Sequence, residues 1–314
     1  MVFRPSVLCP VDFSTASRGA LRYGAAIAQH FQAKLSVLTV NDPLVAEAAA
    51  IRLGRDWLPQ DSRRELQRFL DDTFGGRAPV DDVELLVETG KPAPEILRVA
   101  AAGRHDLIVM SSHGLTGIRK MFFGTTTERV LRETHVPVLV TPPDDPGPLT
   151  LERIAAAIGR ILVPVDLSTA TPRQVRIARG LAEALRAPLL LAHVTEPIRF
   201  PGSPEISLSD VERQRRTRAE AELESLAAAM RPGVDVEIAS VFGDPPEELA
   251  RLARERQAGL IVMGLHASPG GGPRMGSVTY RVLTLTRTLV LALPPVSSPD
   301  AGPAAAPTGA TAGA

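Results

Sequence analysis

The sequence predicts an α/β fold built as two tandem, doubly wound domains, each with a five-stranded parallel sheet. Short segments rich in Val, Leu and Ile alternate with longer segments of helical spacing, which is typical of strand–helix–strand units. The order of these segments in the first half of the chain returns in the second half. A length of 314 residues also fits two domains better than one.

The first half contains five expected strands and four expected helices. The strands are short and apolar, as in buried parallel sheets, and they cover residues 6–11, 35–40, 83–87, 107–110 and 136–140. The helices between them cover residues 16–30, 63–74, 94–102 and 126–133. Ser14, Thr15 or Ser17 can cap the first helix, and Pro92 or Pro94 suits the first turn of the third. This alternation implies right-handed crossovers and a sheet covered on both faces.

Three collinear matches indicate that the second half repeats the first. Residues 11–14 (Val-Asp-Phe-Ser) return as 165–168 (Val-Asp-Leu-Ser), 154 residues later. Residues 90–95 match 243–248, and residues 107–110 match 260–263, both at an offset of 153. A repeat this long is a duplicated domain rather than a solenoid unit. The second half is expected to have strands near residues 161–165, 189–194, 235–239, 260–263 and 288–293.

Proline-rich segments mark the boundaries of the two domains. Residues 142–148 form a stiff connector, so we expect a first domain at 1–142, a linker at 143–157 and a second domain at 158–294. Residues 295–314 are mainly Pro, Ala, Gly, Ser and Thr, a composition that predicts a disordered tail. The last strand of each domain would leave an open sheet edge, so the two domains are expected to pair through these strands as an intrachain pseudo-dimer. A further homodimer is left open.

The composition disfavours several classes of protein. Thirty-five basic and 35 acidic residues give a net charge of 0, which disfavours binding to nucleic acid or to an anionic membrane. Cys9 is the single cysteine and cannot form an internal disulfide, so a reducing, cytoplasmic setting is expected. No apolar run approaches the ~18–20 residues of a membrane helix, and the N-terminal residues show no signal-peptide pattern.

The most informative segment follows the fourth strand of the first half. In doubly wound sheets, ligands bind beyond the carboxyl ends of the strands, where the strand order reverses. Here Gly114 and Gly124 permit close backbone approach, residues 125–127 offer threonine hydroxyls and amides at a helix N-terminus, and Arg119 and Lys120 lie between. This pattern is typical of a phosphate site, although glycine and threonine also serve as ordinary caps at such turns.

With these residues, the chain resembles the universal stress protein family in its tandem form. The resemblance extends from about Pro5 to Pro294. The ATP-binding members of that family carry Gly-x-x-Gly, then nine residues, then Gly-Ser/Thr. This chain has Ser111-x-x-Gly114, nine residues and Gly124-Thr125, so only the first glycine is replaced. The resemblance implies a Rossmann-like fold of the adenine nucleotide alpha hydrolase type.

The resemblance also implies that the first half binds ATP, with or without Mg²⁺. Asp12, Pro10 and the backbone near Val40 would face the adenine and ribose, while the glycines and threonines of the loop would hold the phosphates. The implied nucleotide-binding residues are Pro10, Val11, Asp12, Val40, Met110, Ser111, Gly114, Gly124, Thr125, Thr126 and Thr127.

The second half keeps only part of this pattern. Asp166, Gly264, Gly276 and Ser277 are implied as a second, less complete nucleotide site. Ala267 stands where the second glycine belongs, and eight residues follow it where nine are expected. Two of those eight are prolines, which lack an amide donor. The comparison of the two loops therefore predicts one ATP per chain, bound by the first half.

The remaining candidates have simpler interpretations. His113 is expected to make a local hydrogen bond, and Cys9 to pack as a small, inert apolar side chain. Gly90-Lys91 lacks the spacing of a P-loop and begins a helix. The arginines of residues 213–218 alternate with glutamates at helical spacing, which predicts a solvated, salt-bridged helix. The acidic pairs at residues 71–72 and 81–82 are expected to be solvated rather than metal ligands.

Three functions are consistent with this pattern. The first is a nucleotide-dependent regulatory module of the stress response that acts on an unidentified protein partner. The second is a weak ATPase or phosphoryl-transfer enzyme that uses Arg119, Lys120 and a metal held by the phosphates, with or without Asp12. The third is an interaction scaffold that needs no nucleotide. The first is favoured because the sequence contains no identifiable general base and no Ser-His-Asp or Cys-His pattern.

Overall fold

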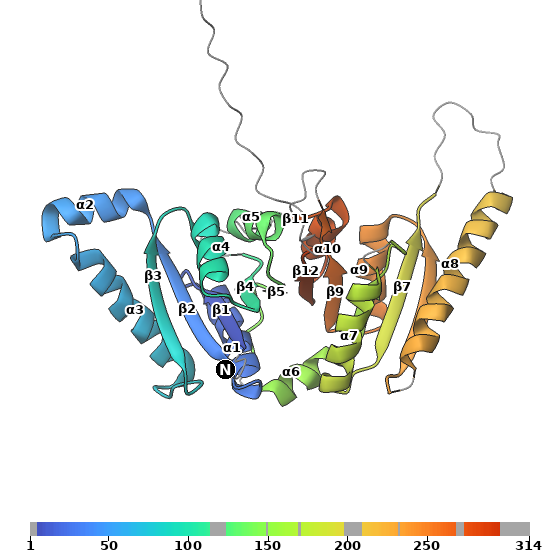
Figure 1. The fold of residues 1–314 in the computed structure, drawn as a ribbon, viewed down its shortest axis with the longest axis horizontal. Helices are drawn as coiled ribbons and strands as arrows, with labels where there is room; N and C mark the ends of the chain where they lie inside the picture. Colours follow the sequence, from blue (N-terminus) through green and yellow to red (C-terminus); the bar gives the residue numbers. More distant parts are fainter. Residues whose placement is uncertain are drawn as a thin grey trace, which may run out of the picture.

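The computed structural model describes residues 5–113, 124–148, 150–168, 171–197, 209–231, 233–267 and 273–295. Residues 296–314, for which the sequence predicts a disordered tail, lie outside the described residues. The described part is one long, twisted sheet with helices on both faces (Figure 1). None of the helices described is both long and apolar enough to cross a membrane.

The first half contains five parallel strands in the order β3-β2-β1-β4-β5. The strands are β1 (Ser6–Pro10), β2 (Lys34–Asn41), β3 (Val83–Thr89), β4 (Leu107–Ser111) and β5 (Val138–Thr141). The helices are α1 (Thr15–His30), α2 (Pro43–Leu53), α3 (Trp57–Phe74), α4 (Pro92–Ala102) and α5 (Thr125–Glu133). Ser14 caps α1 by accepting from the Ser17 amide at 3.1 Å, and Pro92 is the first residue of α4. All the expected strands and helices of this half are present.

The second half repeats this arrangement in the order β12-β9-β6-β7-β8. Its five long strands are β6 (Ile161–Pro164), β7 (Leu189–Thr195), β8 (Val236–Phe242), β9 (Leu260–Gly264) and β12 (Leu289–Leu293), and a small hairpin contains β10 (His266–Ala267) and β11 (Pro273–Arg274). Its helices are α7 (Thr171–Leu185), α8 (Ser209–Met230), α9 (Pro245–Glu255) and α10 (Ser277–Leu285). The expected tandem, doubly wound α/β fold is confirmed.

The two halves join edge to edge through their last strands. β5 pairs antiparallel with β12, with Leu139 opposite Leu291 and Val140 opposite Val290. This pairing creates a single ten-stranded sheet and removes two open edges. The expected pairing of the last strands within the chain is therefore present.

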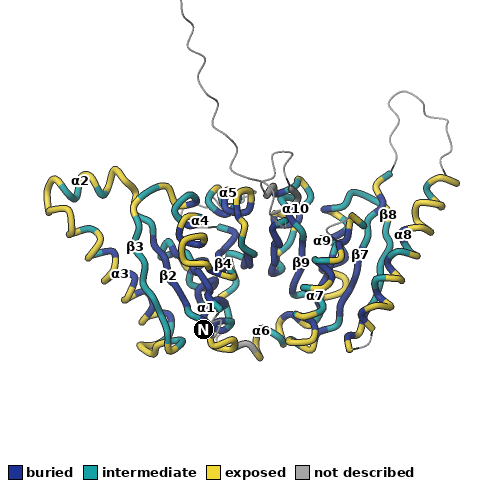
Figure 2. The backbone as a smooth tube through the Cα atoms, viewed as in Figure 1, coloured by how far each residue is buried: buried dark blue, intermediate teal, exposed yellow. Residues whose placement is uncertain are grey.

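The side chains pack in two layers, one on each face of the sheet. One layer lies beneath α1, α3, α7 and α8 and contains Leu66 and Leu223, and the other lies beneath α4, α5, α9 and α10 and contains Ile96 and Leu249. Each layer draws residues from both halves of the chain. Figure 2 shows the strands as mostly buried and the outer faces of the helices as exposed.

The connector between the halves is packed rather than extended in solvent. The sequence predicts only a proline-rich linker at 143–157, but the structure contains helix α6 (Leu151–Ile158), which buries Ile154 and Ile158. The segment before α6 lies against α1, where Tyr23 Oη donates to Asp145 Oδ2 at 2.7 Å and Arg22 Nη1 donates to the Pro146 carbonyl at 3.0 Å.

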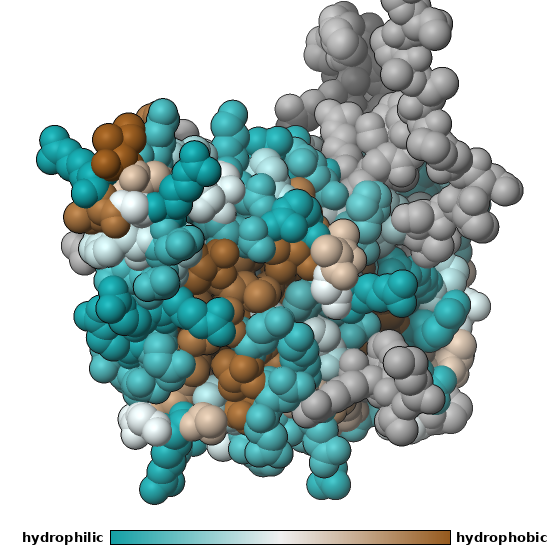
Figure 3. All heavy atoms as spheres, turned by 60° about the vertical axis from the view of Figure 1, so that its left-hand side comes forward, coloured by the Kyte–Doolittle hydropathy of each residue, from teal (hydrophilic) through white to brown (hydrophobic). Residues whose placement is uncertain are grey.

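Helix α2, like α6, is not predicted from the sequence. None of its residues is buried, and Leu44 and Ile51 are 75% and 79% exposed. It projects from one end of the sheet (Figure 1), and Figure 3 shows hydrophobic side chains among hydrophilic ones on that end of the molecule. Its apolar residues surround the helix instead of forming one stripe, so the periodicity of a helix packed on a sheet is missing.

Candidate functional site

The carboxyl ends of β1 and β4 separate from each other. The register between these two fully described strands contains only Val7 opposite Leu107 and Leu8 opposite Ile108. In the strand order β3-β2-β1-β4-β5, the chain moves to one side of β1 for β2 and β3 and to the other side for β4 and β5. A crevice at such a reversal is the usual ligand site of a doubly wound sheet.

Asp12 lies at this reversal of the strand order, shortly after the end of β1. Its Oδ1 accepts from the Ser14 amide at 3.2 Å and from Ser14 Oγ at 2.6 Å. Phe13 between them has a left-handed φ of 63°, which turns the chain sharply from β1 into α1. The Val11 amide donates to the Leu38 carbonyl of β2 at 2.8 Å, so the turn is anchored to both strands. The carboxylate is thus held in one orientation at the end of the sheet.

The N-terminus of α5 faces the same edge. The Gly124 amide donates to the Ser112 carbonyl at 2.9 Å, and Thr127 Oγ1 donates to the Ser111 carbonyl at 2.8 Å. A Cβ at Gly124 would lie 3.0 Å from the Ser112 oxygen, so a larger residue would disturb this contact. No described side chain caps α5, whose first turn contains Thr125 and Thr126. Backbone amides at such an end attract anions.

Most of the other expected site residues of the first half have buried or half-buried side chains, so mainly their backbone atoms are available at this edge. Val11 and Met110 are 6% and 5% exposed and pack in the core. Ser111 Oγ donates to the His113 carbonyl, and Pro10 and Val40 are half-buried. Gly114, Arg119 and Lys120, which the sequence places in the phosphate loop, lie outside the described residues.

The second half builds the same turn around Asp166. Asp166 Oδ1 accepts from the Ser168 amide at 3.0 Å, and Leu167 has a left-handed φ of 59°. Asp166 and Gly264 line a cavity of about 490 Å³ at the carboxyl edge of β6, β7 and β9. Gly276 precedes α10, and Ser277 is its exposed first residue. The structure therefore brings Asp166, Gly264 and the start of α10 to one edge of the sheet.

Several residues that line this cavity were not predicted from the sequence. They include Gln174 of α7, His193 of β7 and Arg215 of α8. The offset of 154 residues places Gln174 and His193 opposite Ala20 and Thr39 of the first half. A polar residue that replaces a small one at such a position is the signal that would have identified them.

The simpler interpretations agree with the structure for His113, Cys9, Lys91 and the arginines of α8. His113 Nδ1 lies 3.0 Å from Ser112 Oγ, a local hydrogen bond. Cys9 is fully buried, and burial raises the pKa of its thiol, so the unreactive thiol form is favoured.

Lys91 immediately precedes Pro92, the first residue of α4, so it lies at the start of a helix as expected. Among the described residues, no three His, Cys, Asp or Glu side chains form a metal-binding group. On α8, Arg216 and Arg218 pair with Glu220 and Glu222 at 2.7 and 2.9 Å.

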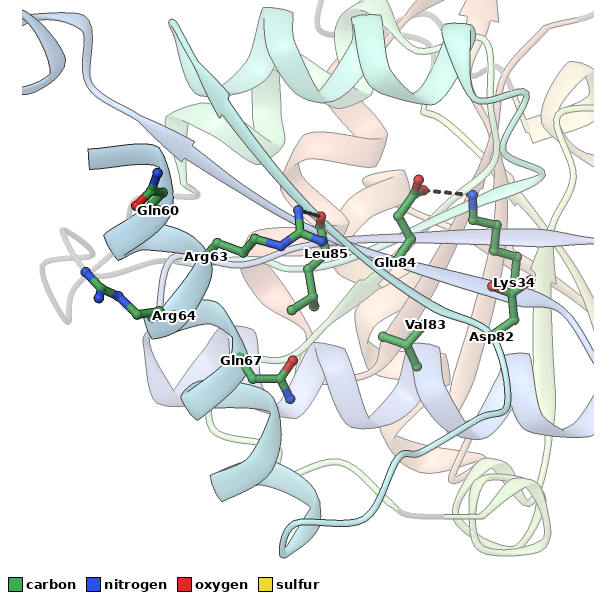
Figure 4. Close-up of a pocket in the computed structure, with 9 residues that line it drawn as sticks. All are labelled: Lys34, Gln60, Arg63, Arg64, Gln67, Asp82, Val83, Glu84 and Leu85. Carbon is green, nitrogen blue, oxygen red and sulfur yellow. Dashed lines mark hydrogen bonds and ion pairs between the residues drawn. The ribbon is translucent and has the colours of Figure 1, made fainter. Parts of the chain in front are cut away.

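A larger groove lies along the edge strand β3, away from the crevice (Figure 4). Its volume is about 720 Å³. Arg63 reaches across from α3 and its Nη1 donates to the Leu85 carbonyl at 3.2 Å, while Lys34 Nζ and Glu84 Oε2 form an ion pair of 2.8 Å. The groove contains none of the expected nucleotide-binding residues, and these polar groups already have partners, so it is not the candidate site.

Comparison with known proteins matches both halves of the chain to one family. The model of the universal stress protein family matches residues 4–142 and again 157–294. A universal stress protein of Mycolicibacterium smegmatis is 23% identical over 296 residues, which cover 92% of this chain and 97% of the relative. Another, from Methanocaldococcus jannaschii, is 30% identical over 140 residues, or 43% of this chain and 79% of the relative. The solved structure of a universal stress protein from Archaeoglobus fulgidus has a TM-score of 0.62 at 19% identity, covers 92% of this chain and is itself covered to 97%.

Proposed function

Because the chain belongs to the universal stress protein family, we propose that it is a nucleotide-dependent regulatory module of the stress response that binds ATP in its first half. The observation that carries this proposal is the pair of groups at the diverging carboxyl ends of β1 and β4. Asp12, held by Ser14, follows β1, and the N-terminus of α5 is bound to the end of β4. A carboxylate and a set of backbone amides at one edge suit the two ends of a nucleotide, namely the ribose hydroxyls and the phosphates.

Gly124 supports the assignment of the phosphate end to α5. Its amide is bound to the Ser112 carbonyl, and the space for a Cβ is restricted by that same oxygen. This close approach holds the amides of the next residues toward the crevice. A Mg²⁺ ion would take its ligands mainly from the phosphates and water, since the described residues contain no group of three side chains for it.

The position of α5 supports a regulatory role. The helix begins at the proposed phosphate site and leads into β5, the strand that pairs with β12 of the second half. It also contacts β11, which belongs to the second half. A ligand bound at the start of α5 therefore acts on the junction between the two halves. Through this junction it also affects the surface that a protein partner would contact.

Calorimetry with ATP on the full chain tests this function. We expect one ATP per chain, and we expect the Asp12→Ala variant to lose affinity by about tenfold or more, because it removes charge-assisted hydrogen bonds to the ribose. The matched control is Asp166→Ala, which removes the equivalent carboxylate of the second half and should leave ATP affinity nearly unchanged.

Two results would overturn the proposal. The first is the absence of ATP binding to the parent chain. The second is an equal loss of affinity in both aspartate variants, or a stoichiometry near two, which would mean that the first half is not the specific ATP site. Mass spectrometry of protein purified without added nucleotide provides an independent measurement of what the chain carries.

A further inference from the structure

Strand β3 leaves one edge of the sheet open. It is the first strand in the order β3-β2-β1-β4-β5, and β2 is its only neighbour among the described strands. At its two ends, the Asp82 carbonyl accepts from the Leu35 amide at 3.0 Å, and the Gly90 amide donates to the Asn41 carbonyl at 3.0 Å. Because the backbone groups of successive residues point to opposite sides of a strand, the even-numbered residues of β3 bond to β2 and the odd-numbered ones point outward. The outward residues include Val83, Leu85 and Val87.

This edge is apolar and partly exposed. Every residue from 83 to 88 is half-buried, whereas residues 6–9 of the inner strand β1 are all buried. The side chains of Val83 and Leu85 lie on the side of the strand that α3 covers (Figure 4), and Leu86 lies on the side that α4 covers. A strand with outward backbone groups and apolar side chains is a template for one more strand.

Helix α3 forms a polar wall beside this edge. The residues of the wall are spaced three and four apart, so they share one face of the helix, and they line the groove of about 720 Å³ between α3 and β3. They are Gln60, Arg63, Arg64 and Gln67. The wall contains two cations and no carboxylate. An added strand would therefore meet positive charge on the side of α3.

Arg63 is the cation that a ligand could use. Its Nη1 donates to the outward carbonyl of Leu85 at 3.2 Å, and no described carboxylate forms an ion pair with it (Figure 4). The other two cations of the groove already have carboxylate partners: Lys34 pairs with Glu84, and Arg64 pairs with an acidic residue of its own helix. Arg63 thus occupies an acceptor that an added strand would use. A backbone amide of that strand can replace it there, and the guanidinium can then pair with a carboxylate.

The opposite edge of the sheet has a different chemistry. A groove of about 580 Å³ follows the edge strand β8 between α8 and α9. Each arginine that the structure describes in its lining is paired with a carboxylate, so an acidic ligand would have to compete with an existing ion pair. These pairs are Arg216–Glu220, Arg251–Glu255 and Arg256–Glu237.

We propose that the β3 edge binds an extended acidic peptide of a protein partner as an added β-strand. The peptide backbone pairs with the outward groups of Val83, Leu85 and Val87. On the side of α3 the peptide carries acidic side chains that meet Arg63, and on the other side it carries apolar side chains that lie beside Leu86.

A second copy of this chain fits the edge less well than an acidic peptide. Antiparallel pairing of two β3 strands keeps the same face of both sheets on one side, so it would bring the two α3 walls together. Arg63 and Arg64 of both copies would then lie opposite each other, and like charges in such a position oppose pairing. The surface is also separate from the proposed ATP site, because none of the expected nucleotide-binding residues lines the groove.

Binding of a synthetic peptide to the full chain tests the proposal. The probe has seven residues, the length of β3, in which glutamate alternates with valine, and a second peptide has lysine in place of glutamate. Fluorescence anisotropy should show one glutamate peptide per chain and about tenfold weaker binding to Arg63→Glu. That variant should prefer the lysine peptide, which also shows that it is folded. The matched control is Arg68→Glu, since Arg68 is exposed on α3 but does not line the groove, and it should bind the glutamate peptide as the parent does.

Hydrogen exchange distinguishes an added strand from simple charge attraction. In the complex with the glutamate peptide, NMR should show at least about tenfold slower exchange of the amides of Val83, Leu85 and Val87. The equivalent outward amides of β8, those of Ile238 and Ser240, should exchange as in the free chain. The proposal is overturned if the glutamate peptide does not bind, if Arg63→Glu and Arg68→Glu bind it equally well, or if the β3 amides stay unprotected in the complex. No nucleotide is present in these measurements, so their outcome is independent of the proposed ATP site.

Discussion

His105 is a buried histidine whose ionisation is linked to folding. It follows α4 and is 7% exposed, and its ring packs so closely on Gly103 that a Cβ there would lie 2.3 Å from Cε1. Burial lowers the pKa of His105. Hydrogen bonding to the backbone of Ala100 and Val99 opposes this shift in part, while the charge of Lys34 adds to it and that of Glu84 opposes it. The folded chain thus holds this ring neutral in a pH range where the unfolded chain protonates it.

This linkage predicts a loss of stability in mild acid. Below the ordinary histidine pKa of about 6.5, the unfolded chain binds more protons than the folded chain, so the free energy of unfolding falls as the pH falls. The contribution is fully present above that value and disappears toward the lowered pKa of the folded state. Urea unfolding between about pH 7.5 and about pH 5.5 should show a shallower decline in His105→Asn than in the parent. The exposed His135→Asn serves as the control; an equal decline in all three proteins would contradict the assignment.

At the residue scale, the sequence predicts those site residues whose type and position after a strand already indicate a binding role. Asp12 and Asp166 follow apolar strands in both halves, and the structure holds them in matching turns. Gln174 and His193 could not be found by this route, because their neighbours in sequence are those of an ordinary helix and strand. Their role depends on which strand ends the fold brings together.

Among the elements, α6 and α2 show that burial, rather than helical sequence, decides what a helix contributes. Both are short and rich in alanine, and each contains isoleucine. α6 places Ile154 and Ile158, four residues apart, against the core shared by both halves, whereas α2 buries no residue. The two helices therefore form a natural comparison within one chain.

Truncation of one isoleucine in each helix measures this difference. Ile158 is 2% exposed, so Ile158→Ala should reduce the free energy of unfolding by about 2–5 kcal/mol through lost contacts and a cavity. Ile51 is 79% exposed, so Ile51→Ala should change it by less than about 0.5 kcal/mol. Urea unfolding of both variants provides the measurement. A small cost for Ile158→Ala would mean that the connector is not part of the folded core.

The elements of the sheet could be predicted because buried parallel strands leave continuous apolar runs, such as Leu107 to Met110 and Leu260 to Met263. The connector could not, since its prolines suggest a spacer and give no sign of Tyr23 and Arg22, which hold it on α1. The two-residue strands β10 and β11 are too short to leave any periodicity.

At the scale of the whole molecule, the two halves depend on each other through one strand pair and two continuous core layers. Leu139 and Leu291 face each other across the junction and are 7% and 9% exposed. Removal of either half would expose a short apolar strand with unpaired backbone groups. The ten-stranded sheet has its remaining edges at β3 and β8, and Arg63 covers one carbonyl of β3.

The first half expressed alone, as residues 1–148, should therefore self-associate. β5 carries the apolar residues that β12 normally covers, and its closest substitute for β12 is the β5 of a second copy, which can also pair antiparallel. Sedimentation velocity should show a dimer or larger species. In the same fragment, Leu139→Lys should restore the monomer, because a lysine on an edge strand opposes pairing. A parent fragment that is monomeric, soluble and as stable as the full chain would show that β12 serves no protective role, and the junction would then be a contact of two independently stable domains.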